Sequence, residues 1–418
     1  MKRAVIVALT LAALTGVSTP AWAWGARTRV AIVSTAARII SKESGANLVK
    51  LEKDIRAGAA IAPSELTQMV PVAITDPVGA IETEMYLLQA VGGGRVDPYF
   101  AYRLGVLGTL VAMATAPLAD SEPALRDLYY ADVEGEIERV QLKPARRTKV
   151  DPPSYFAEVR SDAAGRRDLI LTDYRTGIGF KGTAGIAISE DASRSVNAVA
   201  DVYQSVLIGK VASANISPSQ IRNYIVGAIQ FYIRRGNDAE TESAYKRLTD
   251  LKVSTVDLQK QIGDMFYDAG KYERAMLEYH AVLALDPARR DVTERIAAYY
   301  VKLGDDATAA NKLEAARDAF QNALNVDKLQ PDAQRRLLDA EKAIEERDAR
   351  LAAAREFLAA ADAKLGQATD QVAFRRDYGG AIALLYEAQG GYKKITNEFA
   401  PEYRMAQNGL LTAESQLN

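Results

Sequence analysis

The sequence contains no cysteine and a single histidine, His280. These absences exclude a thiol nucleophile, a disulfide, an iron–sulfur centre and any zinc site made of cysteines or several histidines. A Ser-His-Asp triad would have to use His280. That residue follows Tyr279 on a predicted helix without a second imidazole or thiol, so we predict a surface histidine. We expect no cofactor.

An excess of one charge sign is also absent, because 52 lysines and arginines stand against 54 aspartates and glutamates. No overall basic field is available to hold nucleic acid, and we expect no nucleic-acid partner. Residues 143–149 form a local basic cluster without interleaved aromatic residues, which predicts a solvated loop. Gly177, Gly179 and Gly182 form G-x-G-x-x-G, but no second strand–helix unit follows, so we predict a tight loop between helices.

Long hydrophobic runs are scarce. Residues 4–14 are apolar, follow Lys2 and Arg3, and precede the sequence Ala21-Trp22-Ala23, a layout typical of a cleavable secretory signal peptide spanning residues 1–23. The run is shorter than the roughly 20 residues that a membrane span needs. We therefore predict a mature protein that begins at Trp24 and is periplasmic or secreted, with no transmembrane span after cleavage.

A second uncharged stretch covers residues 104–119 and is rich in glycine and alanine. It is too short for a comfortable membrane span. We predict a buried central helix that Pro117 ends. The helix predicted from Ser193 to Leu207 has an apolar stripe typical of a core contact.

The carboxyl half contains a repeat. Gly236, Gly270 and Gly304 lie 34 residues apart, and an aromatic residue precedes each glycine by four positions. This spacing resembles the tetratricopeptide repeat, a helix-turn-helix unit whose glycine lets the first helix turn into the second. The resemblance implies repeats over residues 213–330.

The middle copy, which contains Gly270, is the clearest. Gly263 and Ala275 supply small residues, Phe266 and Tyr279 supply large ones, and Pro287 closes the copy. The preceding copy has Thr241 where the small residue belongs. The following copy is predicted to contain an inserted loop around residues 305–311 before it resumes at Leu313.

Residues 331–418 are predicted to form the carboxyl-terminal helices. Residues 331–365 are dense in alanine, glutamate and arginine and predict one long helix or a tight helical hairpin. A last degenerate repeat is predicted to begin at Asp377-Tyr378, capped by the helix after Pro401.

Stacked helix pairs of this kind curve, and their first helices line a concave groove that takes a peptide or a partner's helix. The first-helix positions have mixed charge, which is also typical of a solvated face. The partner-binding candidates are Asn223, Gln230, Arg234, Asp257, Lys260, Asp264, Tyr267, Asp291 and Glu294.

The region of residues 24–212 has a second resemblance. The start Trp24-Gly25, the segment ending at Pro63-Ser64, and the helix predicted at residues 104–119 together resemble the zinc-dependent phospholipase C and single-strand nuclease superfamily. Members of that family are all-helical secreted phosphodiesterases with a cluster of three zinc ions. The resemblance implies that Trp24 would bind one ion through its free amine and carbonyl group.

The family's other ligand positions have lost their donors. Histidine or aspartate stands there in the family, whereas this sequence has Arg29, Ser64, Thr109, Met113 and Ala119. Zinc needs imidazole, carboxylate or thiolate donors, and none of these side chains supplies one. A guanidinium also places a fixed positive charge where a dication would lie. The sequence therefore predicts a pseudoenzyme with no metal and no catalytic residues.

Taken together, the sequence predicts an all-α protein: a phospholipase C-like helical bundle followed by a tetratricopeptide α-solenoid. The predicted function is a non-catalytic adaptor or assembly scaffold for other periplasmic or envelope proteins. One alternative is a metal-dependent phosphodiesterase with a rebuilt magnesium or calcium site at Glu82, Glu84, Asp120 and Glu122, favoured if these converge with Trp24. Another is a structural subunit of a cell-envelope complex, which large exposed apolar patches would favour.

Overall fold

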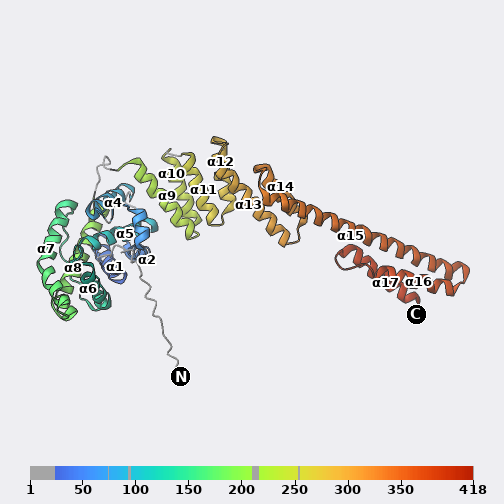
Figure 1. The fold of residues 1–418 in the computed structure, drawn as a ribbon, viewed down its shortest axis with the longest axis horizontal. Coiled ribbons are helices and arrows are strands. Elements are labelled where there is room, and N and C mark those ends of the chain that lie inside the picture. The colour runs from blue at the N-terminus through green and yellow to red at the C-terminus, as the bar shows by residue number, and fades with distance from the viewer. Residues whose placement is uncertain (1–23, 74, 93–95, 210–215, 253–254, 418) are drawn as a thin grey trace, which may run out of the picture. The chain divides into compact units, whose positions relative to one another are not determined.

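The computed structural model describes residues 24–73, 75–92, 96–209, 216–252 and 255–417, and the predicted signal peptide lies outside them. Every regular element in this part of the chain is helical, which confirms the all-α prediction. The chain divides into two compact units (Figure 1), unit 1 up to Ser254 and unit 2 from Thr255 onward. Residues 213–254, grouped with the repeats by sequence, belong to unit 1.

Unit 1 contains ten α-helices among its described residues. They are α1 (Ala26–Ser44), α2 (Glu52–Ala59), α3 (Pro63–Met69), α4 (Pro77–Gly92), α5 (Pro98–Ala114), α6 (Pro123–Glu136), α7 (Pro152–Arg175), α8 (Thr183–Ile208), α9 (Pro218–Arg234) and α10 (Asp238–Asp250). Short 3₁₀ turns lie at Leu48–Leu51, Ile137–Arg139 and Gly179–Lys181. Six of the helices begin at proline, whose fixed φ suits the first helical position and whose missing N–H would have had no partner there.

Helix α5 is the centre of unit 1, and nearly all of its side chains are buried. This confirms the buried helix predicted over residues 104–119, although the helix ends at Ala114, before Pro117. Thr115 follows it, and its hydroxyl lies 2.8 Å from the hydroxyl of Ser195 on α8. That contact ties the end of α5 to the helix whose apolar stripe was predicted to face the core.

The crossing of α2 and α5 depends on two glycines. A Cβ atom on Gly58 would lie 2.0 Å from the carbonyl oxygen of Tyr102, and one on Gly105 would lie 2.1 Å from that of Ile55. Real Cβ atoms do not approach backbone so closely, so any side chain at either position would push the helices apart.

Helix α9 packs on α5 through aromatic rings. Tyr99 of α5 lies 4.9 Å from Tyr224 and 5.2 Å from Phe231, measured between ring centroids. Gly227 leaves room for the Tyr99 hydroxyl, since a Cβ there would lie 2.2 Å from it. The α9–α10 hairpin is therefore part of the same packed unit as the amino-terminal helices.

Unit 2 begins with two helical hairpins and continues into a long helix. Its elements are α11 (Val256–Asp268), α12 (Tyr272–Leu285), α13 (Arg290–Ala309), α14 (Leu313–Val326), α15 (Pro331–Asp370), a π-helical turn (Gln371–Arg375), α16 (Tyr378–Tyr392) and α17 (Ala400–Leu417). Within each hairpin a glycine faces an aromatic ring: Gly263 faces Tyr279, and Gly304 faces Phe320. Small residues thus allow close helix packing, as the spacing predicts.

Two of the repeat glycines lie in turns and the third does not. Gly236 and Gly270 have φ of +65° and +75° and end α9 and α11. Gly304 lies inside α13, which continues to Ala309. The predicted loop around residues 305–311 is therefore mostly wrong, because this stretch has no glycine or proline and Thr308 bonds to the Gly304 carbonyl at 2.8 Å. The chain turns instead near Asn311, with φ of +56°.

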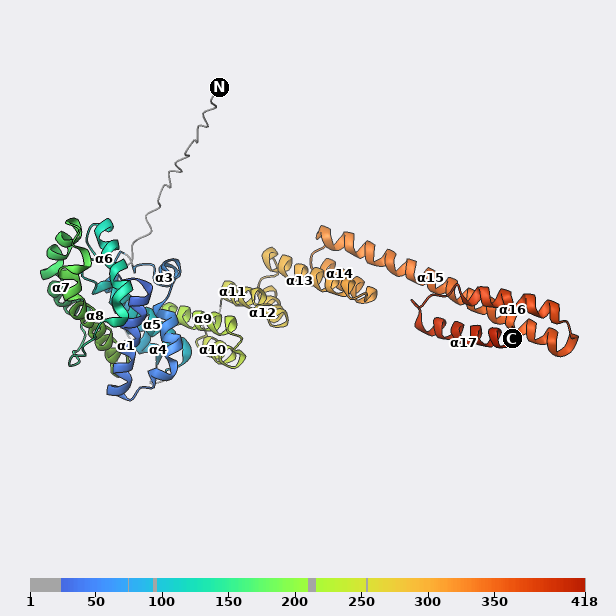
Figure 2. The same cartoon turned by 90° about the horizontal axis from the view of Figure 1, so that it is seen from below.

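Helix α15 is a single helix from Pro331 to Asp370, which settles the choice between one long helix and a hairpin. Its carboxyl-terminal half packs against α16 and α17 (Figure 2). This three-helix cluster has a core of mainly small residues around Leu358, Leu385 and Tyr392. The Tyr392 hydroxyl donates to Asp362 at 2.6 Å.

Candidate functional site

Three positions of the predicted pseudoenzyme site lie together in unit 1. The buried guanidinium of Arg29 donates to the carbonyl oxygens of Trp24 at 3.4 Å, Ala59 at 3.4 Å and Ile61 at 3.5 Å. The Thr109 hydroxyl donates to the same Ala59 oxygen at 3.1 Å. A side-chain cation is therefore held among main-chain carbonyl groups at this point, next to the carbonyl of Trp24.

A carboxylate from α6 lies close to this cation. Glu134 accepts from the main-chain N–H groups of Arg27 at 2.6 Å and Thr28 at 3.0 Å, and from the Thr28 hydroxyl at 2.7 Å. It thereby caps the first turn of α1 with negative charge. Burial lowers the pKa of Arg29 to about 10, and the attraction of Glu134 opposes that decrease. At neutral pH the guanidinium keeps its charge.

The Trp24 side chain and the remaining positions of the predicted pseudoenzyme site have varied surroundings. Trp24 is fully buried, with its ring 6.1 Å from that of Tyr129 and 5.4 Å from that of Tyr130. Ser64 is exposed on α3, Met113 is half-buried in α5, and Ala119 is half-buried in the segment before α6. Hydroxyl, thioether and methyl groups are not the donors that zinc selects.

The four carboxylates of the alternative metal site have different surroundings. They are Glu82, Glu84, Asp120 and Glu122. Glu84 is buried and accepts from both Nε and Nη2 of Arg103, at 2.7 and 2.5 Å. Asp120 and Glu122 are exposed in the segment before α6. Among the described residues, no three histidines, aspartates or glutamates are grouped so that they would hold a metal ion.

Six of the nine partner-binding candidates lie in unit 2, and ion pairs join four of them. Lys260 of α11 reaches Asp264 at 2.6 Å and Asp291 of α13 at 3.6 Å. Arg289 pairs with Asp291 at 2.9 Å and with Asp257 at 2.6 Å. The charges alternate in sign across the two helices.

The fifth candidate, Tyr267, lies among aromatic and cationic groups. The Arg295 guanidinium lies 5.0 Å from its ring centre, and the Tyr272 ring lies 5.1 Å away. Tyr272 in turn lies 5.4 Å from Tyr299, and the Lys302 ammonium lies 5.8 Å from the Tyr272 ring centre. We call this set the α11–α13 face: Asp257, Lys260, Asp264, Tyr267, Tyr272, Arg289, Asp291, Arg295, Tyr299 and Lys302.

Half of this face was missed at the sequence level. Asp291, Arg295 and Tyr299 recur at steps of four, which places them along one side of a helix. Lys302 completes that side. The four-residue spacing is visible in the sequence.

The remaining four candidates lie elsewhere. Three are on α9 in unit 1, with Asn223 and Arg234 exposed and Gln230 half-buried. Glu294 pairs with Arg290 at 2.8 Å on another side of α13. His280 is exposed on α12, as predicted.

Electrostatics keep the α11–α13 face charged over a wide pH range. Hydrogen bonding to Arg289 lowers the pKa of Asp291 to about 2. Burial raises the pKa of Tyr267, so its hydroxyl is neutral at physiological pH. The face therefore presents both charge signs beside uncharged phenol rings.

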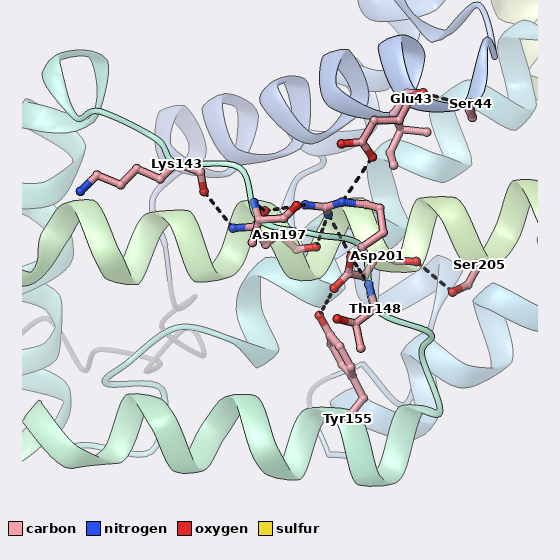
Figure 3. Close-up of polar contacts among 11 residues, drawn as sticks. Glu43, Ser44, Lys143, Thr148, Tyr155, Asn197, Asp201 and Ser205 are labelled. Carbon is pink, nitrogen blue, oxygen red and sulfur yellow. Dashed lines mark hydrogen bonds and ion pairs between the residues drawn. The ribbon is translucent and has the colours of Figure 1, made fainter.

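The basic loop of residues 143–149 is not the fully solvated loop that the sequence predicts. Arg147 is packed onto α8, where it pairs with Asp201 at 2.9 Å and with Glu43 of α1 at 3.3 Å. Figure 3 shows Tyr155 of α7 donating to the other oxygen of Asp201, at 2.8 Å. The prediction fails at Arg147 because the buried Asp201 carboxylate requires a counter-charge. The cluster joins three helices and the loop, which is a structural role.

Two smaller features have plain structural explanations. Gly177 and Gly179, with φ of +78° and +57°, form the predicted tight loop between α7 and α8. A cavity of about 230 Å³ lies between α4, α5, α9 and α10, beside Asp97, Tyr224 and Arg247. It is smaller than the roughly 300–1,000 Å³ typical of small-molecule sites.

In the part of the chain that the structure describes, no helix has the length and apolar character needed to cross a membrane. Comparison with known proteins adds no family: neither a family description, nor a curated protein, nor a solved structure matches this chain.

Proposed function

We propose that this protein is a non-catalytic adaptor of the cell envelope, periplasmic or secreted, that binds another protein on the α11–α13 face. The observation behind the proposal is the gathering of tyrosine, arginine and paired charges on one side of α11 and α13. Tyrosine and arginine are the side chains that contribute most often to protein interfaces.

The ion pairs of the α11–α13 face are weak enough for a partner's charged groups to replace them. Lys260 and Asp264 are only partly buried, as are Arg295 and Asp264. Exposed pairs of this kind contribute about 0–1 kcal/mol, so a partner's charges replace them at little cost. A tyrosine ring offers apolar area for contact, and its hydroxyl group can form a hydrogen bond. The chemistry fits an extended peptide or helix with both charge signs and an apolar side chain.

The packing of the hairpins supports the proposal that residues 213–330 are tetratricopeptide-like repeats. In unit 2, Gly263 faces Tyr279 in one hairpin and Gly304 faces Phe320 in the next. Repeats of this class present their first helices to partners, and α11 and α13 are the first helices of these hairpins.

We also propose that the amino-terminal domain is a pseudoenzyme related to the zinc-dependent phospholipases. Support comes from Arg29, whose guanidinium donates to the Trp24 carbonyl, the group that would bind zinc in the family. Elemental mass spectrometry of the purified protein, before and after incubation with zinc, tests this proposal. We expect no stoichiometric zinc, and one or more tightly held ions per chain would contradict it.

Selection of peptides from a random displayed library on the purified protein tests the binding face. We expect the selected peptides to lose at least tenfold in affinity with Tyr267→Ala or Arg295→Ala, which is about 1.4 kcal/mol. Glu294→Ala, on another side of α13, is the matched control and should bind normally. Equal affinity of all three variants, or no selected peptide, would refute the assignment.

A further inference from the structure

Helix α16 presents a row of large apolar side chains to solvent. Phe374, just before the helix, is 83% exposed, and Tyr378, Ile382 and Tyr386 are 62%, 47% and 61% exposed. Tyr378, Ile382 and Tyr386 recur at steps of four residues and therefore follow one side of α16, whereas Phe374 lies on the π-helical turn before it, beyond Arg376 with φ of +53°. Residues 378–386 contain no charged side chain. Such a row is unusual on a surface helix, where polar residues normally face water.

The other side of α16 is already occupied. Ala381, Leu385 and Ala388 are buried against α15 and α17. The exposed row is thus a second apolar face, not a displaced core face. We call it the α16 stripe, comprising Tyr378, Ile382 and Tyr386, with Phe374 exposed just before it.

Small residues lie beside the stripe. Gly379, Ala383 and Gly390 are exposed on the same side of the helix. A Cβ atom added to Gly390 would meet no atom within 4 Å, so open space surrounds this position. Large side chains next to small ones give a helix both projections and hollows, the pattern by which helices interlock.

The charges at the two ends of the stripe have opposite sign. Arg375 and Arg376 are exposed just before it, and together with the N-cap residue Asp377 they leave a net positive charge there. Glu387 is exposed just past its end, where it reaches Lys364 of α15 at 2.8 Å. A sequence that is positive, then apolar, then negative becomes its own complement when the helix is reversed. This complementarity distinguishes a second copy from an anionic membrane, which would attract only one end.

We propose that the α16 stripe is a homodimer interface, in which α16 of one copy packs antiparallel against α16 of a second copy about a two-fold axis near Ile382. Each Tyr378 then faces the second copy's Tyr386. Arg375 and Arg376 lie near the second copy's Glu387, once at each end. A two-fold interface of this type uses the same patch on both copies.

The contact is small. The nine residues of α16 from 378 to 386 span about 13 Å of helix, and a standard stable interface buries about 800 Å² on each partner. The dimer is therefore in exchange with monomer and responds to protein concentration.

Sedimentation equilibrium of the purified protein over about 1–100 μM, the range in which a weak interface dissociates, tests the proposal. We expect a monomer–dimer equilibrium. The double variant R375E/R376E and the variant E387R should each weaken it at least tenfold, since like charges then meet at both ends. An equimolar mixture of the two charge variants should regain dimer, because opposite charges meet again in the mixed pair.

Ile382→Glu on the two-fold axis should also abolish the dimer, and Leu411→Glu, at an exposed apolar position of α17, is the matched control that should not. Circular dichroism verifies that every variant is folded. A wild-type protein that stays monomeric at all concentrations overturns the proposal, as does a dimer that the charge variants leave intact. Neither result bears on peptide binding at the α11–α13 face, which is measured separately.

Discussion

Among the described residues, unit 1 has ion pairs in which both side chains are buried, whereas each ion pair of unit 2 leaves at least one side chain partly exposed. In unit 1, the side chains of Arg103 and Glu84 are 7% and 4% exposed. In unit 2, those of Lys260 and Asp264 are 23% and 25% exposed, and those of Lys302 and Asp306 are 48% and 65% exposed. The side chains of these ion pairs in unit 2 therefore remain accessible to water.

The difference matters for function because burial changes what an ion pair does. A buried pair fixes the arrangement of the helices around it, since either partner alone would be a charge without compensation. An exposed pair contributes little to stability and exchanges readily with solvent or with a partner. The buried pairs of unit 1 therefore hold its helices in place, and the partly exposed pairs of unit 2 remain available for binding.

The largest effect is expected from Glu84→Ala, which leaves Arg103 buried without its partner. We expect unit 1 to lose about 3–5 kcal/mol of unfolding free energy. Lys260→Ala in unit 2 should cost no more than about 1 kcal/mol. Urea unfolding followed by tryptophan fluorescence is the measurement for unit 1, because the sequence has only Trp22 and Trp24.

The double variant E84L/R103M is the control for Glu84→Ala. Removing both charges and filling their volume should restore much of the lost stability. If the single variant is as stable as the wild type, the charge is not buried as described, and the contrast between the units fails.

Arg29→Ala is expected to have the next largest effect. It leaves the carbonyl groups of Trp24, Ala59 and Ile61 without the guanidinium and opens a cavity, a loss of about 2–4 kcal/mol. Arg27→Ala, two residues away in an exposed pair with Glu138, should not change the unfolding curve measurably. Equal stability of the two variants would mean that Arg29 does not hold this part of unit 1.

The sequence predicts most of the helices, and the reasons are local. Proline begins α5, α7 and α15, and the turn glycines Gly236 and Gly270 end α9 and α11. These signals depend on φ preferences within a few residues, so they can be recognised in the sequence without knowing the tertiary contacts.

Features that depend on long-range contacts were not predictable in this way. Gly304 has the same spacing as Gly270, yet it allows Phe320 to approach inside a helix. Arg147 stands in a basic loop, but its partner Asp201 is 54 residues away in sequence. The clustering of Arg29 with Thr109 likewise follows from the α2–α5 crossing, which no local pattern encodes.

The variant Gly304→Ala tests the packing of α13 against α14 in unit 2. The added methyl group would lie 2.3 Å from the Phe320 ring, so α13 and α14 must separate, and we expect a loss of about 1–3 kcal/mol. Gly366→Ala in α15 is the matched control. Its Cβ meets nothing within 4 Å, and alanine should stabilise that helix by about 0.5–1 kcal/mol. Thermal unfolding followed by far-UV circular dichroism distinguishes the two, and similar shifts in the same direction would contradict the packing.

The smallest effect is electrostatic and belongs to the α11–α13 face. Arg289 lowers the pKa of Asp291 to about 2 from an ordinary 3.8. A carboxyl group whose pKa is lower in the folded state contributes stability above pH 3.8, and that contribution is lost as the pH falls through about 2. An NMR titration of labelled aspartate should therefore find the Asp291 midpoint near 2 in the wild type and closer to 3.8 in Arg289→Ala. Because the pair is exposed, added salt should raise the wild-type midpoint. A midpoint that is unchanged by the variant would show that Asp291 is not held by Arg289 in solution.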